Sequence, residues 1–404
     1  MNLAYVSPLP PLHSGIADYS AILLPQLRPY FSRIVAVVDG SAPSLPPGIV
    51  DQVYDVSADQ DWWLDARAVP LYHMGNHLHY HSYIYRSLQR FPGITVLHDG
   101  NLLPFVHDAT LAAGNRRDFI REAGFERGGD GITAAWAALR SSEPLCLEDY
   151  PMLARVVSSS LGVIVHNHYL RGRIEALACP KVPIAVIPML NMMRPEAATP
   201  SRREAKEALG LDPDGMLVGT FGFIASSKRL DQALEAFSRL RDRFPGIRFV
   251  CVGELAPEYD FAAVVTRLGL RDCVHVTGYT PMEMFRRYLY AVDAGLNLRH
   301  PTWGESSASL VRMMACGIPT LVSDVGAFAE LADETVVKVP VGSGEVDAIA
   351  SALRALLSDA DLRTRIGAAA RAYVEGQCAP KKVAEQYAAF IYRVIRTGSS
   401  IANR

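Results

Sequence analysis

The sequence predicts an α/β protein with two doubly wound parallel-sheet domains, one in each half of the chain. Short, wholly apolar runs alternate with helical patterns along most of the 404 residues, which is typical of parallel sheets covered on both faces. A stretch rich in Pro, Ala and charge, residues 191–215, interrupts this alternation, which then restarts. A chain of this length exceeds one ordinary hydrophobic core, so two domains are expected.

The first half contains six apolar runs that predict buried strands. They are residues 3–7, 34–39, 69–76, 94–99, 161–167 and 183–188. Helical patterns such as 15–29 and 80–90 separate them. Residues 104–160 break the alternation and have a mainly helical pattern, so we interpret them as an insertion. The first domain is therefore expected to span 1–190, with a helical insertion at about 104–160.

The second half repeats the strand–helix alternation. Its predicted strands are residues 216–223, 247–253, 274–279, 294–299, 319–324 and 336–340. Its predicted helices are residues 228–244, 259–269, 281–290, 306–316, 326–332 and 344–357. The second domain is expected to span 191–376, and a last helix at about 380–396 lies in a C-terminal segment, 377–404.

Composition excludes several classes of protein. The formal net charge of −2 argues against a general nucleic-acid binder. The six cysteines have no CxxC spacing, which favours reduced structural thiols in a cytoplasmic protein. The N-terminal residues lack the basic region of a signal peptide, and no apolar run approaches the roughly 20 residues of a membrane span.

Ligands of doubly wound sheets bind outside the carboxyl ends of the strands. The polar and glycine residues expected there are Ser7, Asn76, His98 and Asp99 in the first half and Gly222, Gly278 and Arg299 in the second. The site is therefore expected in the cleft between the two domains.

Residues 304–309 form the first candidate motif. Glu305 stands before Ser306, Ser307, Ala308 and Ser309, at the start of a predicted helix. A helix N-terminus offers unpaired N–H groups and partial positive charge, and small residues let a phosphate approach them. The alternative is that Ser306 and Ser307 only cap the helix. A cap needs one such residue, so four small residues favour the anion site.

The second motif is "GTFGFIASSK", residues 219–228. Gly222 ends a strand, Ser227 lies in the loop and Lys228 begins the next helix. A lysine there opposes the usual preference for acidic residues in the first turn, which a bound anion would explain; an exposed lysine is the alternative. The P-loop pattern is absent.

The third motif is Ser14–Gly15, which precedes a helix after the first strand. The G-x-G-x-x-G fingerprint is missing, so hydride chemistry is disfavoured. A glycine needed only for a tight strand-to-helix turn is the alternative.

A metal site is not expected. Histidines 73, 77, 79 and 81 cluster in the sequence, but the i, i+2 spacing of the last three fits no helical ligand pair. Asp-x-Asp occurs at 59–61 and 212–214, both in turn-like segments rather than at a strand end.

The motifs together resemble the retaining GT-B glycosyltransferases of glycosyltransferase family 4. The resemblance rests on "SGIADYS", "YHMGN", "VLHD", "GFIASSKRLDQALEAF", "VTGY" and "GESSASLVRMMACGIPTLVSDVGAFAEL", in order along nearly the whole chain. It implies a nucleotide diphosphate-sugar held mainly by the second domain, and a last helix that crosses back onto the first.

The resemblance also implies roles for individual residues. Glu305, His98 and Lys228 are the expected catalytic residues: Glu305 contacts the donor-sugar hydroxyls, His98 lies near the sugar, and Lys228 pairs with phosphate. The expected donor-binding residues are Gly15, Gly222, Phe223, Ser227, Lys228, Gly278, Tyr279, Arg299, Gly304, Glu305, Ser306, Ser307, Ala308, Ser309 and Leu310. The expected acceptor-side residues are Ser14, Asn76, His98 and Asp99.

Two positions depart from the family pattern. Met313 stands where the family often has a ribose-binding glutamate, with Arg312 beside it. Phe223 stands where the family often has an arginine, five residues before the phosphate lysine. Arg299 or Arg229 is a candidate to replace that missing cation.

The expected activity is transfer of a sugar, with retention and without metal or other cofactor, to a hydroxyl of a glycan, lipid-linked or small-molecule acceptor. The alternatives are a non-transferring enzyme such as a sugar-nucleotide epimerase, for which Asp99 is an available acid, and a non-catalytic sugar-nucleotide-binding module. We expect a cytoplasmic protein, in contact with no nucleic acid and able to touch the inner face of the membrane.

Overall fold

The computed structural model describes residues 1–40, 42–59, 61–141, 145–146, 149–177, 181–193 and 199–402. Cys179 and parts of the predicted insertion and linker (142–144, 147–148 and 194–198) lie outside these residues. The chain divides into two compact units. The first comprises Met1–Leu190, Trp303–Ser306 and Ala379–Arg404, and the second comprises Asn191–Thr302 and Ser307–Cys378.

The first unit is built on a seven-stranded parallel sheet. Its strands are β1 (Asn2–Val6), β2 (Arg33–Val38), β3 (Gln52–Asp55), β4 (Val69–Met74), β5 (Ile94–Leu97), β6 (Gly162–Val165) and β7 (Ile184–Val186). They lie in the order β3-β2-β1-β4-β5-β6-β7. The central strands are almost fully buried, as expected when helices cover both faces.

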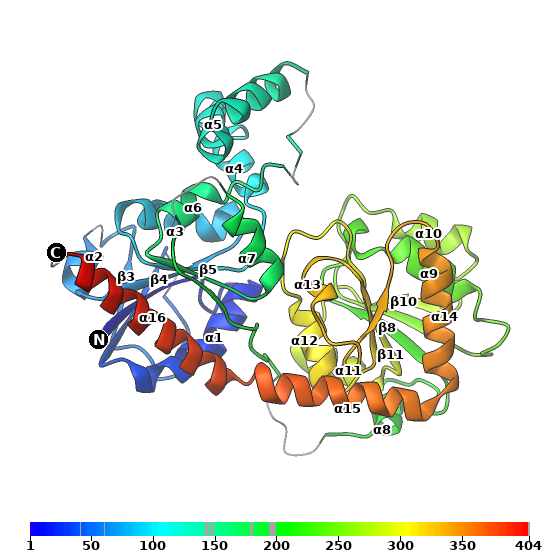
Figure 1. Cartoon of the computed structure of the whole chain (residues 1–404). Helices are drawn as coiled ribbons and strands as arrows, with labels where there is room; N and C mark the ends of the chain where they lie inside the picture. Colours follow the sequence, from blue (N-terminus) through cyan, green and yellow to red (C-terminus); the bar gives the residue numbers. More distant parts are fainter. Residues whose placement is uncertain are drawn as a thin grey trace. The chain divides into compact units, whose positions relative to one another are not determined.

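Two groups of helices accompany this sheet (Figure 1). The helices are α1 (Gly15–Leu27), η1 (Arg28–Tyr30), α2 (Trp62–Ala66), α3 (Leu78–Arg90), α4 (Leu103–Thr110), α5 (Arg116–Ser141), α6 (Ala154–Ser158), α7 (His168–Glu175) and α16 (Pro380–Ala402). Helices α1 and α16 run side by side, and α3 packs with α4 and α6. Although α4–α6 separate β5 from β6 in the chain, these strands pair directly, with Ile94 opposite Gly162.

The second unit has a six-stranded parallel sheet. Its strands are β8 (Leu217–Phe221), β9 (Arg248–Val252), β10 (Val274–Val276), β11 (Ala294–Asn297), β12 (Thr320–Ser323) and β13 (Val337–Val339). They lie in the order β10-β9-β8-β11-β12-β13. The prediction of two parallel-sheet α/β domains is therefore confirmed.

The helices of the second unit include several that pack in pairs. They are α8 (Arg202–Ala208), η2 (Ser226–Lys228), α9 (Leu230–Ser238), α10 (Phe261–Arg267), α11 (Met282–Ala291), α12 (Ala308–Ala315), α13 (Gly326–Ala329), α14 (Glu345–Ser358) and α15 (Ala360–Gln377). Helix α9 packs on α14, α12 on α15, and α8 on α11.

Several elements differ from the sequence prediction. Strand β3 was not predicted because it lies at the edge of the sheet and two of its four residues are exposed, so it lacks an apolar run. Helices α2, α7 and α15 were also missed. The helix predicted at 228–244 begins at Leu230, since Ser226–Lys228 forms a separate 3₁₀ turn and Arg229 has a φ of 57°. The helix predicted at 306–316 spans only Ala308–Ala315.

Both sheets change the direction of winding between two central strands. In the first unit this switch lies between β1 and β4, and in the second between β8 and β11. The crevice at such a switch point, outside the carboxyl ends of the strands, is where doubly wound folds bind ligands. Among the described helices, none is long and apolar enough to span a membrane.

Candidate functional site

The switch point of the second unit brings together two of the predicted motifs. The loop after β8 contains Gly222 to Lys228, and the loop after β11 leads through Arg299 to Ser307, which precedes α12. These loops are more than 70 residues apart in the chain, but they leave adjacent strands, since Leu296 of β11 pairs with Thr220 of β8. The topology therefore joins motifs that the sequence alone leaves separate.

Gly222 is the point at which these motifs meet. Its φ of 87° is a left-handed conformation that glycine adopts without steric cost. A Cβ at this position would lie 2.7 Å from Ser309 Oγ and 3.4 Å from Lys228 Nζ. The hydroxyl of Ser309 and the ammonium of Lys228 thus converge on a spot where only the backbone of residue 222 leaves room.

Lys228 is a buried cation at this point. Its side chain is only 5% exposed, and Nζ donates a hydrogen bond to the carbonyl oxygen of Phe221. Burial, together with the charge of Arg299, lowers the pKa of Lys228 from 10.5 to about 7. Because no acidic side chain offsets this charge among the causes of the shift, an anionic ligand would stabilise the protonated form.

Of the two candidate replacements for the missing arginine, the structure favours Arg299. Arg229 forms a two-pronged ion pair with Glu345, with Nε 3.0 Å from Oε1. Arg299 lies close enough to Lys228 to lower its pKa, and its Nη1 is 3.4 Å from Ser227 Oγ. Phe223 is 57% exposed and supplies a ring but no charge.

The start of α12 serves as a capped helix end and also presents unpaired amides. Ser307 is the N-cap: its hydroxyl donates to Asn297 Oδ1 at 2.8 Å and accepts from the amide of Leu310 at 3.2 Å. The Leu310 amide is therefore engaged in this state. The first-turn amides of Ala308 and Ser309 have no acceptor within the helix, and the Ser309 hydroxyl shares the space at Gly222 with the Lys228 ammonium.

Met313, where the family often has a ribose-binding glutamate, offers no carboxylate. Met313 is fully buried in an apolar cluster with Phe285 and Leu289. The guanidinium carbon of Arg312 lies 5.8 Å from the centre of the Phe285 ring. Met313 therefore contributes packing to the second unit, and its sulfur lies 4.0 Å from the Thr320 hydroxyl.

Gly278 and Tyr279 follow β10 at the carboxyl edge of the same sheet. Gly278 has a φ of 68°, and its carbonyl accepts a hydrogen bond from the Thr280 hydroxyl at 2.8 Å. Tyr279 is 67% exposed. An aromatic ring this exposed is available for stacking on a planar ligand.

Glu305 lies in a segment, Trp303–Ser306, that belongs to the first unit. Its Oε2 accepts a hydrogen bond from the Trp303 amide at 2.7 Å. Asn167, which caps α7, donates from Nδ2 to the Gly304 carbonyl at 2.8 Å and to Ser306 Oγ at 3.2 Å. Within the first unit, therefore, Asn167 holds the residues on either side of Glu305.

Asn167 was not predicted, because α7 is short and polar and was missed together with its cap. The available signal was the sequence "HNH" at 166–168, an asparagine directly after a strand. Such a residue is a common helix N-cap.

The carboxyl ends of the first sheet carry the predicted acceptor-side residues. Ser14 caps α1, accepting from the Ile16 amide at 3.3 Å. A Cβ added to Gly15 would meet no atom within 4 Å, so no packing requires glycine there, and the turn alternative gains no support. The amide of Asn76 donates to Asp99 Oδ2 at 3.2 Å, which joins the ends of β4 and β5.

His98 lies in a buried row of three histidines. His166 Nδ1 is 2.9 Å from the Ile187 carbonyl, so that nitrogen carries the proton. Because burial lowers the pKa of His166 to about 4, its Nε2 is an acceptor for His98 Nδ1 at 3.3 Å. His98 Nε2 then accepts from His73 Nδ1 at 3.0 Å. Both ring nitrogens of His98 are therefore occupied by other histidines.

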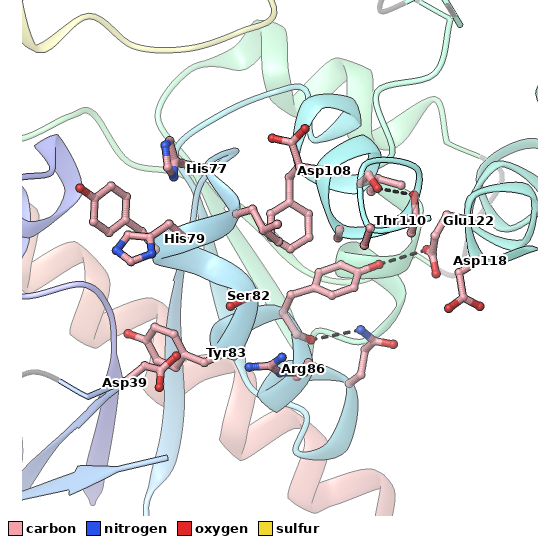
Figure 2. Close-up of a pocket in the computed structure, with 18 of the residues that line it drawn as sticks. Asp39, His77, His79, Ser82, Tyr83, Arg86, Asp108, Thr110, Asp118 and Glu122 are labelled. Carbon is pink, nitrogen blue, oxygen red and sulfur yellow. Dashed lines mark hydrogen bonds between the residues drawn. The ribbon is translucent and has the colours of Figure 1, made fainter. Parts of the chain in front are cut away.

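The first unit also contains a cavity of about 1150 Å³. It lies between the carboxyl ends of β1 and β2 and the helices α3, α4 and α5, and Figure 2 shows its polar side chains. Its residues include Asp39, Tyr83 and Arg86. Of the three, only Asp39 was marked in the sequence, as the end of a predicted strand.

Comparison with known proteins shows which family the second unit is similar to. Residues 201–373 match the family model "Glycosyl transferases group 1". The similarity to this family therefore lies in the second half of the chain. The match contains Gly222, Lys228 and the start of α12, so the switch-point residues all lie in the glycosyl transferases group 1 region.

Curated relatives are similar over part of their length. The chain is 30% identical over 178 residues to "Lipopolysaccharide core biosynthesis mannosyltransferase LpsB" of Rhizobium meliloti (strain 1021), covering 42% of this chain and 48% of that protein. It is 27% identical over 172 residues to "Alpha-D-kanosaminyltransferase" of Streptomyces kanamyceticus, covering 42% and 44%. The chain thus spans about half the length of the curated relatives it matches.

Solved structures extend the likeness of fold to the whole chain. Sucrose-phosphate synthase (tll1590) from Thermosynechococcus elongatus aligns with a TM-score of 0.68 at 16% identity, covering 98% of this chain and 100% of that one. Both units therefore have the GT-B fold that the sequence resemblance implied.

Proposed function

We propose that the protein is a glycosyltransferase that moves a sugar from a nucleotide diphosphate-sugar to an acceptor hydroxyl. The convergence of Lys228 Nζ and Ser309 Oγ at Gly222, beside the N-terminus of α12, carries this proposal. A buried lysine with a lowered pKa next to unpaired helix amides is suited to a group whose negative charge increases, as a departing diphosphate does. The names of the relatives, which include a mannosyltransferase and a kanosaminyltransferase, support the same reaction class.

The bond between the anomeric carbon and the β-phosphate oxygen breaks, and its electron pair leaves with the diphosphate. The acceptor oxygen forms the new bond to the anomeric carbon, and its proton passes to the departing phosphate oxygen. We further propose attack from the face of the leaving group, with retention, as in glycosyltransferase family 4.

Individual residues have the following proposed roles. Lys228 and the α12 amides stabilise the diphosphate, Arg299 supplies a second cation, and Glu305 orients the hydroxyls of the donor sugar. Tyr279 is available to stack on the base. His98 reaches the sugar only if its backbone does so or if the histidine row rearranges, since its ring nitrogens are already bonded.

We also propose that no metal takes part and that the protein works in the cytoplasm, where a peripheral contact with the inner membrane face would give access to a lipid-linked acceptor. Neutralisation by Lys228, Arg299 and the helix N-terminus supports the first of these points, because preorganised donors can replace a cation at a leaving group.

Incubation with candidate sugar nucleotides tests the reaction class. A transferase releases nucleoside diphosphate in proportion to acceptor, and the product's anomeric proton couplings report retention. An epimerase converts the sugar nucleotide without acceptor, and a binding module leaves it unchanged. Either of the last two outcomes would overturn the proposal.

A further inference from the structure

The cavity of the first unit is not accounted for by donor binding. All its lining residues come from the first 122 positions, whereas the residues proposed to hold the diphosphate lie beyond position 221. Its walls are α3 and two helices of the insertion, α4 and α5, with the carboxyl ends of β1 and β2 beside them (Figure 2). The insertion therefore completes a binding-sized space next to a ligand-binding edge of the sheet.

The shape and the neutral part of the lining suit a saccharide. The volume of about 1150 Å³ exceeds that of pockets for drug-sized ligands, roughly 300–1,000 Å³, so it can hold more than one sugar ring. The ring of Tyr80 provides flat apolar surface, and Ser82 and Gln89 provide hydrogen-bonding groups. A long lipid chain would need a more continuous apolar wall than this lining offers.

The charged part of the lining is mainly acidic. Its carboxylates belong to Asp39, Asp108, Asp118 and Glu122, and its guanidiniums belong to Arg86 and Arg121. Arg121 is paired with Asp118 at 3.3 Å, so its charge is largely offset. A phosphate group binds where several arginines converge, and this cavity presents the opposite balance.

Glu122 is also neutralised from outside the cavity, by Arg155, and it accepts a hydrogen bond from Tyr85 at 3.0 Å. The charges that remain to act on a ligand are those of Asp39 and Asp108 against Arg86; one oxygen of Asp108 is also bonded to His107 Nδ1, at 3.1 Å. Carboxylates are acceptors only, so the ligand must supply O–H or N–H donors.

Tyr83 provides an independent sign of a missing ligand. Its side chain is 4% exposed, and among the described residues its hydroxyl has no hydrogen-bond partner. A buried polar group without a hydrogen-bond partner lowers the stability of the fold, so such groups usually have a partner. Tyr83 lies beside Asp39 (Figure 2), and burial, together with the charge of Asp39, raises the pKa of Tyr83. The phenol therefore keeps its proton and pairs with a ligand hydroxyl rather than with a cation.

We propose that this cavity binds the acceptor and that it selects a saccharide without phosphate or carboxylate groups, with an amino-bearing saccharide preferred. Asp39 and Asp108 attract ligand donors and repel anions, Tyr83 completes a hydrogen bond to a ligand hydroxyl, and Tyr80 contacts a ring face. The assignment to the acceptor rests on the proposed glycosyltransferase function. The saccharide preference rests on the lining alone.

Three trisaccharides of equal length test the selectivity: one of glucosamine, one of glucose and one of galacturonic acid. Their binding to the full-length protein is measured by NMR titration. The glucosamine trisaccharide is expected to bind most tightly and the galacturonate one most weakly, with the difference shrinking at high salt. Equal affinity for all three, tighter binding of the galacturonate form, or binding of none overturns the proposal.

Variants locate the binding. Asp39→Asn should lower the affinity for the glucosamine trisaccharide by about tenfold or more, which is the scale of a lost charge-assisted hydrogen bond. The affinity for the glucose trisaccharide should fall less. Tyr83→Phe, which removes only the hydroxyl, should lower the affinity for both trisaccharides. Asp130→Asn and Tyr392→Phe are matched controls outside the cavity lining and should change neither. A preference that survives Asp39→Asn unchanged overturns the assignment, and melting curves check that each variant folds.

The same samples separate this proposal from the proposed function. Release of nucleoside diphosphate from sugar nucleotides reports the donor site, and trisaccharide titration reports the cavity. If nucleoside diphosphate is released but no trisaccharide binds, only the proposal for the cavity is overturned. If trisaccharides bind selectively but no sugar nucleotide gives release or transfer, the proposed function is overturned. The selectivity of the cavity is then still supported.

Discussion

Replacement of Lys228 by methionine is expected to stabilise the free protein while weakening diphosphate binding. The fold lowers the pKa of this lysine from 10.5 to about 7, which corresponds to roughly 5 kcal/mol against the charged form. Methionine removes that cost and keeps most of the side-chain volume. It also leaves the Phe221 carbonyl without its Lys228 partner, a loss of about 1–3 kcal/mol. The net expectation is a gain of roughly 2–4 kcal/mol in the free energy of unfolding.

The gain should depend on pH in a defined direction. Between about pH 7 and 10.5 the unfolded lysine binds a proton that the folded one has released, so the stability of the natural protein rises with pH across this range. The advantage of Lys228→Met should therefore be full at and below pH 7 and disappear as the pH approaches 10.5. Urea unfolding of both proteins at several pH values measures this. Lys338→Met is the control, since Lys338 lies in the same unit and pairs with Asp333 at 2.8 Å.

Binding should move in the opposite direction to stability. Because Lys228→Met loses a charge-assisted contact, its affinity for uridine or guanosine diphosphate should fall at least tenfold, which corresponds to about 1.5–3 kcal/mol of binding free energy. At pH 8 the natural protein should take up close to one proton on binding, because the diphosphate restores the charged lysine. Calorimetry in two buffers of different ionisation enthalpy measures this uptake. A variant that is less stable than the natural protein, or that binds diphosphate with the same affinity and proton uptake, would refute the role assigned to Lys228.

Three further results are expected. Glu305→Gln should lower turnover on the order of 100-fold or more and leave diphosphate affinity unchanged; an active variant with only a lowered melting temperature would show that Glu305 merely stabilises a helix end. Turnover should survive EDTA, and a loss that magnesium or manganese restores would contradict metal independence. Asp293→Asn should cost about 3–5 kcal/mol in urea unfolding, since it strands Lys206, which is buried with its Nζ 2.7 Å from Asp293 Oδ2; a cost below 1 kcal/mol would be inconsistent with a buried pair.

The alternation of apolar runs and helical patterns predicted most of the fold, and each element that it missed has a local cause. The buried strands of both sheets are continuous apolar runs, so they were visible in the sequence. Strand β3 was not, because half of it is exposed at the sheet edge. Helix boundaries shifted where the backbone departs from helical geometry, as at Arg229 with its φ of 57°. The side chain of Arg229 also pairs with Glu345, 116 positions away in the chain, which the local sequence does not reveal.

The candidate site was predictable where a local motif carries it. Lys228 and Ser307 could be marked from their positions at element ends. The meeting of Lys228 with Ser309 could not, because it depends on the pairing of β8 with β11. The bonding of both His98 ring nitrogens also arises only in three dimensions, since His73 and His166 are 25 and 68 residues away.

The direct pairing of β5 with β6 has a consequence for how such a chain can diversify. Because the segment from α4 to α6, residues 103–158, leaves and rejoins the sheet at neighbouring strands, its length and sequence can change without shifting the register of any strand. The segment behaves as an interchangeable cassette, in which α4 and α5 shape one pocket wall and the strands beneath them stay fixed. Under the proposed function, grafting this cassette between chains with the same sheet is a direct route to altered acceptor choice, because the residues proposed to hold the diphosphate lie outside it.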